Sequence, residues 1–486
     1  MAQLELLDWN IDRKSHVPLY LQIASLIKDK IEAGEWTAGS RLPSERLLAA
    51  ELGVNRSTVT AAYAELTAEG LTEGRRGGGT TVVNNTWTLL AATSPPDWNK
   101  YVRGGIHSPN LPVIQEINKA EFVSGIIRLG TGELGREFYP AALMRTAMDK
   151  VARELDSLGY EEPKGNAELR LQISRHLGKL GITVTPESLL IVSGSLQALQ
   201  LVSIGLLDRG STILVEKPSY LYSVNVFQSA GMQLTGLQID KGDGNFLYKL
   251  EALQASKKGS LLYTIPSFHN PSGRVMSMDD RKALLKISER HALPIIEDDA
   301  YRELWLDAPP PPALKALDKS GSVVYTGTLS KTLSPGLRIG WIAGPEPVIN
   351  RLADIKMQTD YGASSISQRI ATEWLASGLY EEHVSQLRTK LKEKRDFVLS
   401  LLEKEYADIA EWNVPSGGFY IWLEIKKDLS LNTLFGKVRQ SGILINTGNI
   451  YDREDRRHLR ISYAFESNER LAQGLMTLAE IIRRLP

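Results

Sequence analysis

The sequence predicts a multidomain protein, with a small N-terminal part of three helices and a β-ribbon and a large C-terminal α/β part. Residues 1–83 hold three stretches with helical apolar spacing, followed by two short apolar runs around a glycine-rich turn. After residue 189, short apolar runs alternate with helical stretches, which is typical of a mostly parallel sheet covered by helices. At 486 residues the chain has room for two or three domains.

The first predicted helix begins at Pro18 and ends at Gly34, since proline favours a first helical turn and glycine a helix end. Its apolar residues fall at spacings of three and four and are Leu19, Ile23, Ile27 and Ile31. A second short helix follows the segment 42–46 and runs to Leu52. After a tight turn at 53–55, a third helix extends from about Arg56 to Glu69.

Two strands are predicted at Leu71–Glu73 and Thr80–Val83, joined by a turn that contains Arg75, Arg76 and Gly77. Three helices followed by a glycine-rich ribbon with arginines at its tip describe a winged helix-turn-helix. Residues 1–83 carry nine Lys+Arg and eleven Asp+Glu, a net charge of 9 − 11 = −2. DNA binding by this part therefore depends on a few well-placed arginines, and on a dimer for affinity.

Lys331 is the centre of the most informative motif in the chain. It lies in a hydroxyl-rich turn after the apolar run that begins at Val323, and Arg338 follows seven residues later. A lysine that is desolvated near other cations has a lowered pKa, so its neutral amine can form a Schiff base with an aldehyde. Thr328, Ser330 and Arg338 are suitable donors to a phosphate. Together these features predict a site for pyridoxal 5′-phosphate (PLP).

This segment resembles the lysine motif of fold type I PLP enzymes, the aminotransferase superfamily. The resemblance implies that Asp298 keeps the pyridine nitrogen protonated and that Tyr301 and Asn270 bind the ring 3′-oxygen. Asp299 is the alternative to Asp298, but the family aspartate lies three residues before the tyrosine. In the family pattern, Tyr220 matches the aromatic that stacks on the pyridine ring. Gly194, Ser195 and Leu196 match the helix start that binds the cofactor phosphate. Tyr160 lies in the segment that reaches the neighbouring subunit's site.

Arg460 extends the same resemblance, because it matches the arginine that binds the substrate carboxylate in this superfamily. From about residue 348 a long helical connection leads to a predicted small α/β domain, in which 418–422 and 460–463 supply strands. The predicted C-terminal fold is therefore fold type I, with a mostly parallel large domain and a small α/β domain.

The N-terminal part resembles the GntR family through Pro-Leu-Tyr, Leu-Pro-Ser-Glu-Arg and Leu-Gly-Val-Asn-Arg-Ser-Thr-Val. That resemblance implies that Arg46 and Arg56 reach DNA and that the wing tip lies near the minor groove. The exposed start of the recognition helix adds Ser57, Thr58 and Thr60, and the wing adds Arg75, Arg76 and Gly77.

The combination resembles the MocR subfamily of bacterial regulators. Its predicted domains are a DNA-binding domain at 1–83, an extended linker at 84–123 and an effector domain at 124–486. The resemblance implies a transcription factor that senses an amino-acid-like amine through an external aldimine with PLP. Two alternatives stay open, an active aminotransferase with a fused DNA-binding domain and a regulator that senses PLP itself. The effector, the operator and the sign of regulation are not encoded in a recognisable motif.

The composition argues against several classes of protein. Lys+Arg and Asp+Glu both number 57, and there is no cysteine, so neither a disulfide framework nor a thiolate metal site is expected. No signal sequence and no apolar run of about 20 residues is present. We expect a cytoplasmic protein with no metal and no membrane partner. Type I PLP sites form at dimer interfaces, which predicts a head-to-tail homodimer on repeated operator half-sites.

Overall fold

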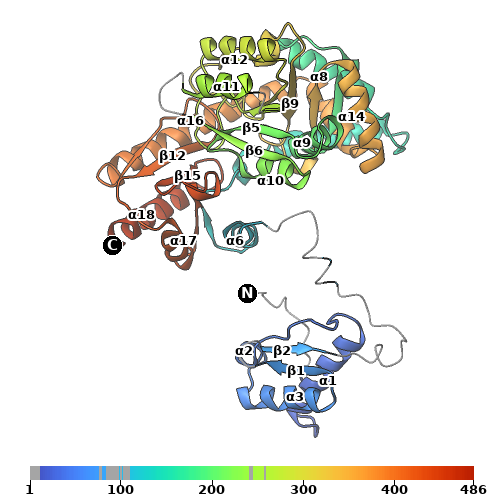
Figure 1. Cartoon of the computed structure of the whole chain (residues 1–486), viewed down its shortest axis with the longest axis vertical. Coiled ribbons are helices and arrows are strands. Elements are labelled where there is room, and N and C mark those ends of the chain that lie inside the picture. The colour runs from blue at the N-terminus through green and yellow to red at the C-terminus, as the bar shows by residue number, and fades with distance from the viewer. Residues whose placement is uncertain are drawn as a thin grey trace. The chain divides into compact units, whose positions relative to one another are not determined.

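The structure is a computed structural model that describes residues 11–75, 79–83, 98, 101, 110–239, 245–256 and 259–486. The chain divides into two units, Met1–Ile106 and His107–Pro486, each described here by itself (Figure 1). No helix in the described ranges combines the length and the apolarity needed to cross a lipid bilayer.

The first unit has the predicted three helices and a two-stranded ribbon. They are α1 (Leu19–Glu32), α2 (Glu45–Leu52), α3 (Arg56–Ala68), β1 (Thr72–Arg75) and β2 (Gly79–Val82). Ser44 caps α2 by accepting a hydrogen bond from the Leu47 N–H, and Gly53 ends α2 in the left-handed conformation with φ 59°. Ile23 and Ile27 of α1 are fully buried against Val59 of α3. The predicted winged helix-turn-helix is confirmed.

The second unit is built on a seven-stranded sheet in the order β4-β10-β9-β8-β7-β5-β6. Only β10 runs antiparallel to its neighbours within this sheet. The strands are β4 (Leu189–Val192), β5 (Thr212–Lys217), β6 (Gln233–Gln238), β7 (Leu261–Thr264), β8 (Ile295–Asp298), β9 (Val323–Thr328) and β10 (Gly340–Ala343). Each corresponds to one of the apolar runs in the sequence, which confirms the mostly parallel sheet.

Alternating residues of these strands enter separate hydrophobic clusters on the two faces of the sheet. In β8, Ile295 packs with α11 and α12, whereas Ile296 packs with α9, α10 and α14. Helices therefore cover both faces, as Figure 1 shows. The helices are α7 (Ala141–Glu154), α8 (Ala167–Lys179), α9 (Ser195–Leu206), α10 (Leu221–Ser229), α11 (Asn245–Ala255), α12 (Met278–His291), α13 (Leu314–Leu317), α14 (Glu346–Thr359) and α15 (Ser365–Ala376).

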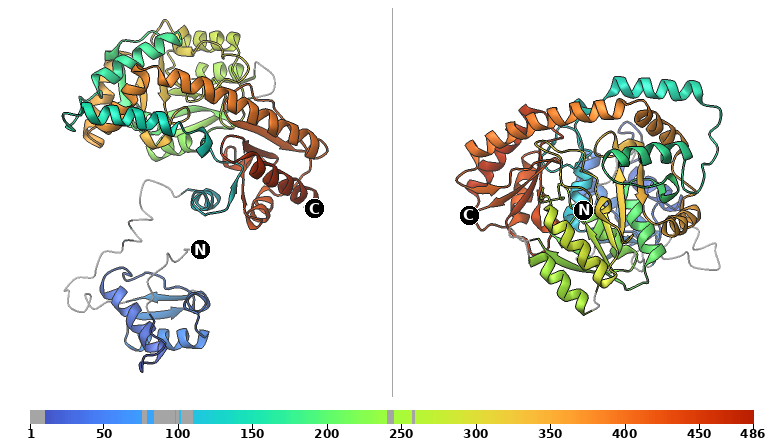
Figure 2. Two further views of the ribbon diagram at one scale, coloured as in Figure 1. Left: turned by 180° about the vertical axis from the view of Figure 1, so that it is seen from behind. Right: turned by 90° about the horizontal axis from the view of Figure 1, so that it is seen from above.

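The long helix α16 (Leu379–Glu405), orange in Figure 2, leads from the large sheet to a small one. The small sheet has the antiparallel order β11-β12-β15-β14 and packs against α16, α17 and α18. A separate parallel pair joins β3 to β13. The bounds are β3 (Ile127–Arg128), β11 (Ala410–Trp412), β12 (Tyr420–Ile425), β13 (Ile443–Leu444), β14 (Asn446–Thr447), β15 (His458–Ser462), α17 (Leu431–Gln440) and α18 (Asn468–Arg484).

One helix falls inside the stretch that the sequence predicts to be extended linker. Helix α6 (Pro112–Ala120) has a proline in its first turn and buries Ile114 and Ile117 in the core of the small sheet. The three-residue spacing of these isoleucines is a helical signal, but the nearby Ser-Pro-Asn and glycine pairs favour a loop. Residues 84–97, 99–100 and 102–109 of the predicted linker lie outside the described residues.

Gly327 is required for close packing between β9 and β10. A Cβ added there would lie 2.5 Å from the Trp341 ring on β10. Because the interior is densely packed, Gly327→Ala should lower the free energy of unfolding of the second unit by about 1–3 kcal/mol, measured by urea denaturation. The matched control is Gly344→Ala, where the added Cβ comes no closer than 3.6 Å to Val324. Equal stability of the two variants would contradict the prediction.

Candidate cofactor pocket and DNA-binding surface

A pocket opens where several strands of the large sheet end. Asp298 ends β8, Thr328 ends β9, and Gly194 lies between β4 and α9. Ligand sites of open α/β sheets form at such carboxyl ends. The lining residues are Gly194, Ser195, Leu196, Leu199, Tyr220, Ile265, Asn270, Asp298, Ala300, Tyr301, Thr328, Ser330, Lys331 and Arg338. They include every predicted cofactor residue except Tyr160.

One end of the pocket has the properties of an anion site. Helix α9 begins here at Ser195, whose Oγ is buried and finds no hydrogen-bond partner among the described residues. Arg338 donates to the Ser193 carbonyl over 2.6 Å, and a Cβ on Gly194 would lie 2.6 Å from the Arg338 Nη2. Backbone N–H groups at a helix start, a free hydroxyl and a guanidinium together suit a phosphate.

The pocket also contains a buried carboxylate, that of Asp298. The Tyr263 hydroxyl donates to Asp298 Oδ2 over 2.8 Å, and Oδ1 has no hydrogen-bond partner in the described structure. Burial raises the pKa of Asp298 to about 6, partly offset by the Tyr263 hydrogen bond. Asp299, the alternative in the sequence, is instead paired with Arg302 and does not line the pocket. An unpartnered oxygen facing this space fits the protonated ring nitrogen of PLP.

Lys331 lines the same pocket. Its Nζ donates to the Gly132 carbonyl over 2.7 Å and is 6.0 Å from the centre of the Tyr301 ring. The Thr328 hydroxyl accepts from the Ser330 N–H over 3.1 Å, which fixes the turn that presents the lysine. The amine, the phosphate-type end and the buried carboxylate therefore fit the three chemical groups of PLP.

Arg460, on β15, is fully buried beside the pocket. It donates to Asn270 Oδ1 over 2.8 Å and to the Gly130 carbonyl over 2.6 Å, and its Nε has no partner in the described ranges. Its guanidinium lies over the Tyr420 ring at 4.1 Å and over the Tyr451 ring at 5.0 Å. A buried guanidinium held by neutral oxygens and aromatic rings is suited to a carboxylate.

Tyr160 is not in this pocket. Its side chain is 83% exposed, and its ring lies 4.8 Å from the Tyr361 ring. The sequence predicts that Tyr160 reaches the site of the neighbouring subunit. Its position outside the pocket of the same chain does not test that prediction.

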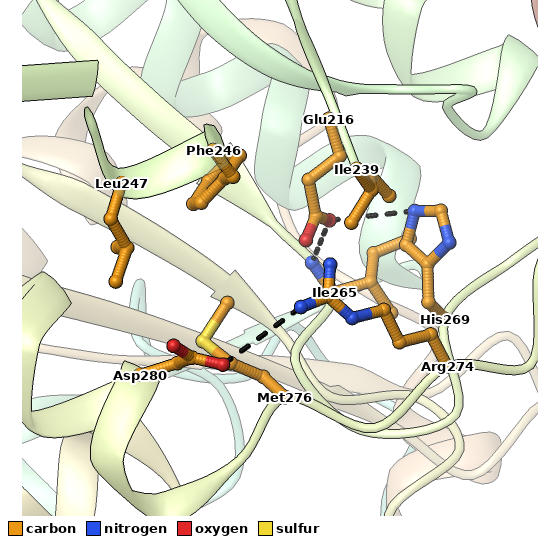
Figure 3. Close-up of a pocket in the computed structure, with 9 residues that line it drawn as sticks. All are labelled: Glu216, Ile239, Phe246, Leu247, Ile265, His269, Arg274, Met276 and Asp280. Carbon is orange, nitrogen blue, oxygen red and sulfur yellow. Dashed lines mark hydrogen bonds and ion pairs between the residues drawn. The ribbon is translucent and has the colours of Figure 1, made fainter. Parts of the chain in front are cut away.

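A second, smaller cavity adjoins the first through Ile265, which lines both (Figure 3). His269 Nδ1 is 2.7 Å from Ser272 Oγ, and His269 Nε2 is 3.4 Å from Glu216 Oε2. Burial lowers the pKa of His269, so the ring is neutral at pH 7. The hydrogen bond between His269 and Ser272 lies within the turn that carries Asn270, so it supports a residue of the larger pocket.

Sequence reasoning missed the residues that orient the predicted ones. Tyr263 holds Asp298, the Tyr420 hydroxyl is 3.0 Å from the Tyr301 hydroxyl, and Gly130 and Gly132 offer their carbonyls to Arg460 and Lys331. A polar tyrosine in the apolar run of β7 was one available signal. The segment 129–132 also resembles the N-terminal entry of the aminotransferase fold, but nothing local indicates which side chains its carbonyls meet.

The predicted DNA-binding residues cluster at the start of α3 and the adjacent turn of α2. Arg56 is 69% exposed and forms an ion pair with Glu45 over 2.9 Å. Arg46, Ser57 and Thr60 are exposed and Thr58 is partly exposed. Arg75 ends β1, with its side chain outside the described residues, and Arg76 and Gly77 lie wholly outside them.

Comparison with known proteins finds a family match for each of the two units. The model of aminotransferase class I and II matches residues 124–478, and the model of bacterial regulatory proteins of the gntR family matches residues 19–82. The HTH-type transcriptional regulator YdfD of Bacillus subtilis is 52% identical, covering 96% of this chain and 97% of its own length. NorG of Staphylococcus aureus, also an HTH-type transcriptional regulator, is 35% identical over 92% of this chain and 100% of its own.

Solved structures match the second unit. An archaeal alanine:glyoxylate aminotransferase superposes with a TM-score of 0.74 at 30% identity, covering 80% of this chain and 99% of its own. The kynurenine aminotransferase of Pyrococcus horikoshii, solved with PMP, gives 0.73 at 29% identity over 78% and 95%.

Fold, pocket and relatives define a helix-turn-helix transcriptional regulator fused to an aminotransferase-like body. The chain belongs to the gntR family of bacterial regulatory proteins, and its body belongs to aminotransferase class I and II. This is the domain arrangement of MocR-type regulators.

The raised pKa of Asp298 makes stability depend on pH. At pH 4 the carboxyl is largely protonated when folded, and as the pH rises towards 6 the unfolded chain loses its proton first, which favours the unfolded state. Asp298→Asn lacks this penalty. In the PLP-free protein its stability advantage over wild type should grow by about 1–3 kcal/mol between pH 4 and pH 7, measured by urea denaturation. A pH-independent difference would contradict this, and exposed Asp279→Asn is the control.

Proposed function

We propose that this regulator holds PLP on Lys331 and senses an amine that bears a carboxylate, with DNA bound by the winged helix within residues 1–83. The observation that carries the proposal is the joint placement of Lys331, unpartnered Asp298 Oδ1 and the anion-type end at Ser195 and Arg338 in one pocket. Buried polar atoms without partners are uncommon in folded proteins, and Ser195 Oγ and Asp298 Oδ1 both belong to residues of this pocket, which supports a bound polar cofactor.

PLP, when bound, would supply an aldehyde that reacts with primary amines. The chain's own residues hold and orient it. Asp298 would accept from the ring nitrogen, Tyr301 and Asn270 would bind the ring hydroxyl, and Tyr220 would cover a ring face. Arg460 would bind the effector's carboxylate. An effector changes DNA affinity only if the protein has two conformations that differ in DNA affinity and the effector binds one of them more tightly.

An active aminotransferase is the second candidate, because Lys331, Asp298 and Arg460 are all in place and the solved relatives are aminotransferases. The third candidate is a regulator that senses PLP itself. Absorbance spectra of the PLP-loaded protein with a panel of amino acids and simple amines separate them. A stable spectral shift without keto-acid turnover supports the effector sensor, turnover supports the enzyme, and indifference to all amines supports PLP sensing.

A homodimer completes the proposal. Tyr160 and Tyr361 form an exposed ring pair, which suits burial against a second copy. Such a dimer would place two winged helices for repeated half-sites on the DNA.

Lys331→Ala and Arg460→Ala should fail at different steps. Lys331→Ala should abolish the link to PLP that borohydride reduces and the associated absorbance in the near-ultraviolet to violet range. Arg460→Ala should keep that absorbance but weaken the response to a carboxylate-bearing amine by a factor of about 30 or more, equivalent to ~2–5 kcal/mol. Exposed Lys404→Ala and Arg484→Ala are the controls. A reducible link in Lys331→Ala, or a normal amine response in Arg460→Ala, would contradict the assignment.

In the winged helix, Arg56→Ala and Arg46→Ala should each weaken operator binding by about 1–3 kcal/mol, measured by electrophoretic shift. A base contact gives a loss that depends on the operator sequence, and a phosphate contact gives a uniform loss with a smaller salt dependence. Lys28→Ala removes one positive charge from α1, where Lys28 pairs with Glu69, and is the matched control. Wild-type affinity in both arginine variants would remove the assignment.

A further inference from the structure

Three residues, Gly130–Thr131–Gly132, contact both groups that a carboxylate-bearing amine would engage. The Gly130 carbonyl accepts from Arg460 over 2.6 Å, and the Gly132 carbonyl accepts from Lys331 Nζ over 2.7 Å. Lys331 and Arg460 belong to different sheets of the second unit, one in the turn after β9 of the large sheet and the other on β15 of the small sheet. One short segment is therefore bonded to both.

This segment, which we call the 130–132 segment, has little room to move by itself. A Cβ on Gly130 would lie 2.2 Å from Asn446 Oδ1, and a Cβ on Gly132 would lie 2.6 Å from the Tyr420 hydroxyl. Thr131 between them is 3% exposed. Because its neighbours are packed so closely, a change in the segment's position must be transmitted to what it touches.

The side chain of Thr131 leads away from the pocket to helix α6. Its Oγ1 donates to Glu121 Oε1 over 3.1 Å. Glu121 caps the C-terminal end of α6, and its N–H donates to the Ile117 carbonyl. Burial raises the pKa of Glu121, an effect that the Thr131 hydrogen bond opposes. The bond is therefore a specific tie between a half-buried carboxyl group and the 130–132 segment.

Helix α6 is the first described helix of the unit His107–Pro486. The chain before it runs without a break in sequence to the winged helix. Ile114 and Ile117 bury one face of α6 in the small-sheet core. A shift of α6 would therefore move the start of the second unit, from which the chain continues to the winged helix.

We propose that the Thr131–Glu121 hydrogen bond relays the state of the pocket from the 130–132 segment to α6, with both residues in positioning roles. This inference rests on the proposed function. With PLP joined to Lys331, the lysine nitrogen would no longer be placed to donate to the Gly132 carbonyl as it does here. A carboxylate bound by Arg460 competes in the same way with the Gly130 carbonyl. Each event removes a donor from the segment, and Thr131 passes the change to Glu121 and α6.

The test is hydrogen exchange of the 112–121 amides in the full-length protein, with PLP alone as the probe. Loading PLP should change their exchange rates at least threefold in the wild type. Thr131→Val removes the hydroxyl at similar volume, and Glu121→Leu removes the acceptor. In both, the absorbance of the lysine-linked cofactor should form as usual while the change at 112–121 falls below about 1.5-fold. Glu121→Gln keeps an acceptor oxygen and should behave as wild type.

The outcomes separate the relay from the proposed function. If PLP forms its link and wild-type exchange at 112–121 does not change, the relay is wrong and the cofactor assignment stands. If Thr131→Val and Glu121→Leu transmit the PLP effect in full, the relay is likewise overturned. If no PLP link forms even in the wild type, the proposed function and the relay both fail. A Thr131→Val variant that does not fold leaves the comparison of Glu121→Leu with Glu121→Gln to decide.

Discussion

Burial of the central sheet on both faces is the constraint on which the rest of the effector unit depends. Alternating residues of β8 and its neighbours enter hydrophobic clusters on opposite faces, so polar side chains cannot lie along the strands without loss of burial energy. The carboxyl ends are where polar groups are tolerated. Asp298, Thr328 and the Gly194–Ser195 turn all lie there, and the pocket is a consequence of this geometry.

The pocket keeps several polar atoms unsatisfied that a purely structural site would pair. Asp298 Oδ1, Ser195 Oγ and Arg460 Nε are all buried and lack hydrogen-bond partners among the described residues. Each lowers the stability of the unliganded protein, because a buried polar atom loses its contacts with water. Such groups persist where a ligand satisfies them, and the same groups make stability and ligand binding dependent on each other.

In the proposed function, DNA binding and effector sensing fall to different units with different chemistry. The winged helix has no excess of positive charge, and Arg56 is held by Glu45 at the start of α3. Few contacts are therefore available to bind DNA, and in the proposed homodimer a modest change in how the two copies are held would alter operator occupancy. The 130–132 segment offers a physical link from the pocket towards that change, since it bonds to Lys331, Arg460 and Glu121 together.

The sequence alone determined what local spacing and residue chemistry encode. The apolar runs at β4 to β10, the three helices and ribbon, and the hydroxyl-rich turn around Lys331 are all local patterns. The predicted cofactor residues other than Tyr160 line one pocket. Only the tertiary structure decided the long-range contacts. Arg460 meets Gly130 across 330 positions and Asn270 across 190, while Tyr263 meets Asp298 because β7 and β8 are neighbours. Helix α6 was not predicted for the same reason, because Ile114 and Ile117 are buried only through their packing in the small-sheet core. Such pairings depend on how elements pack, and no local pattern records which partner a buried carbonyl or hydroxyl will find.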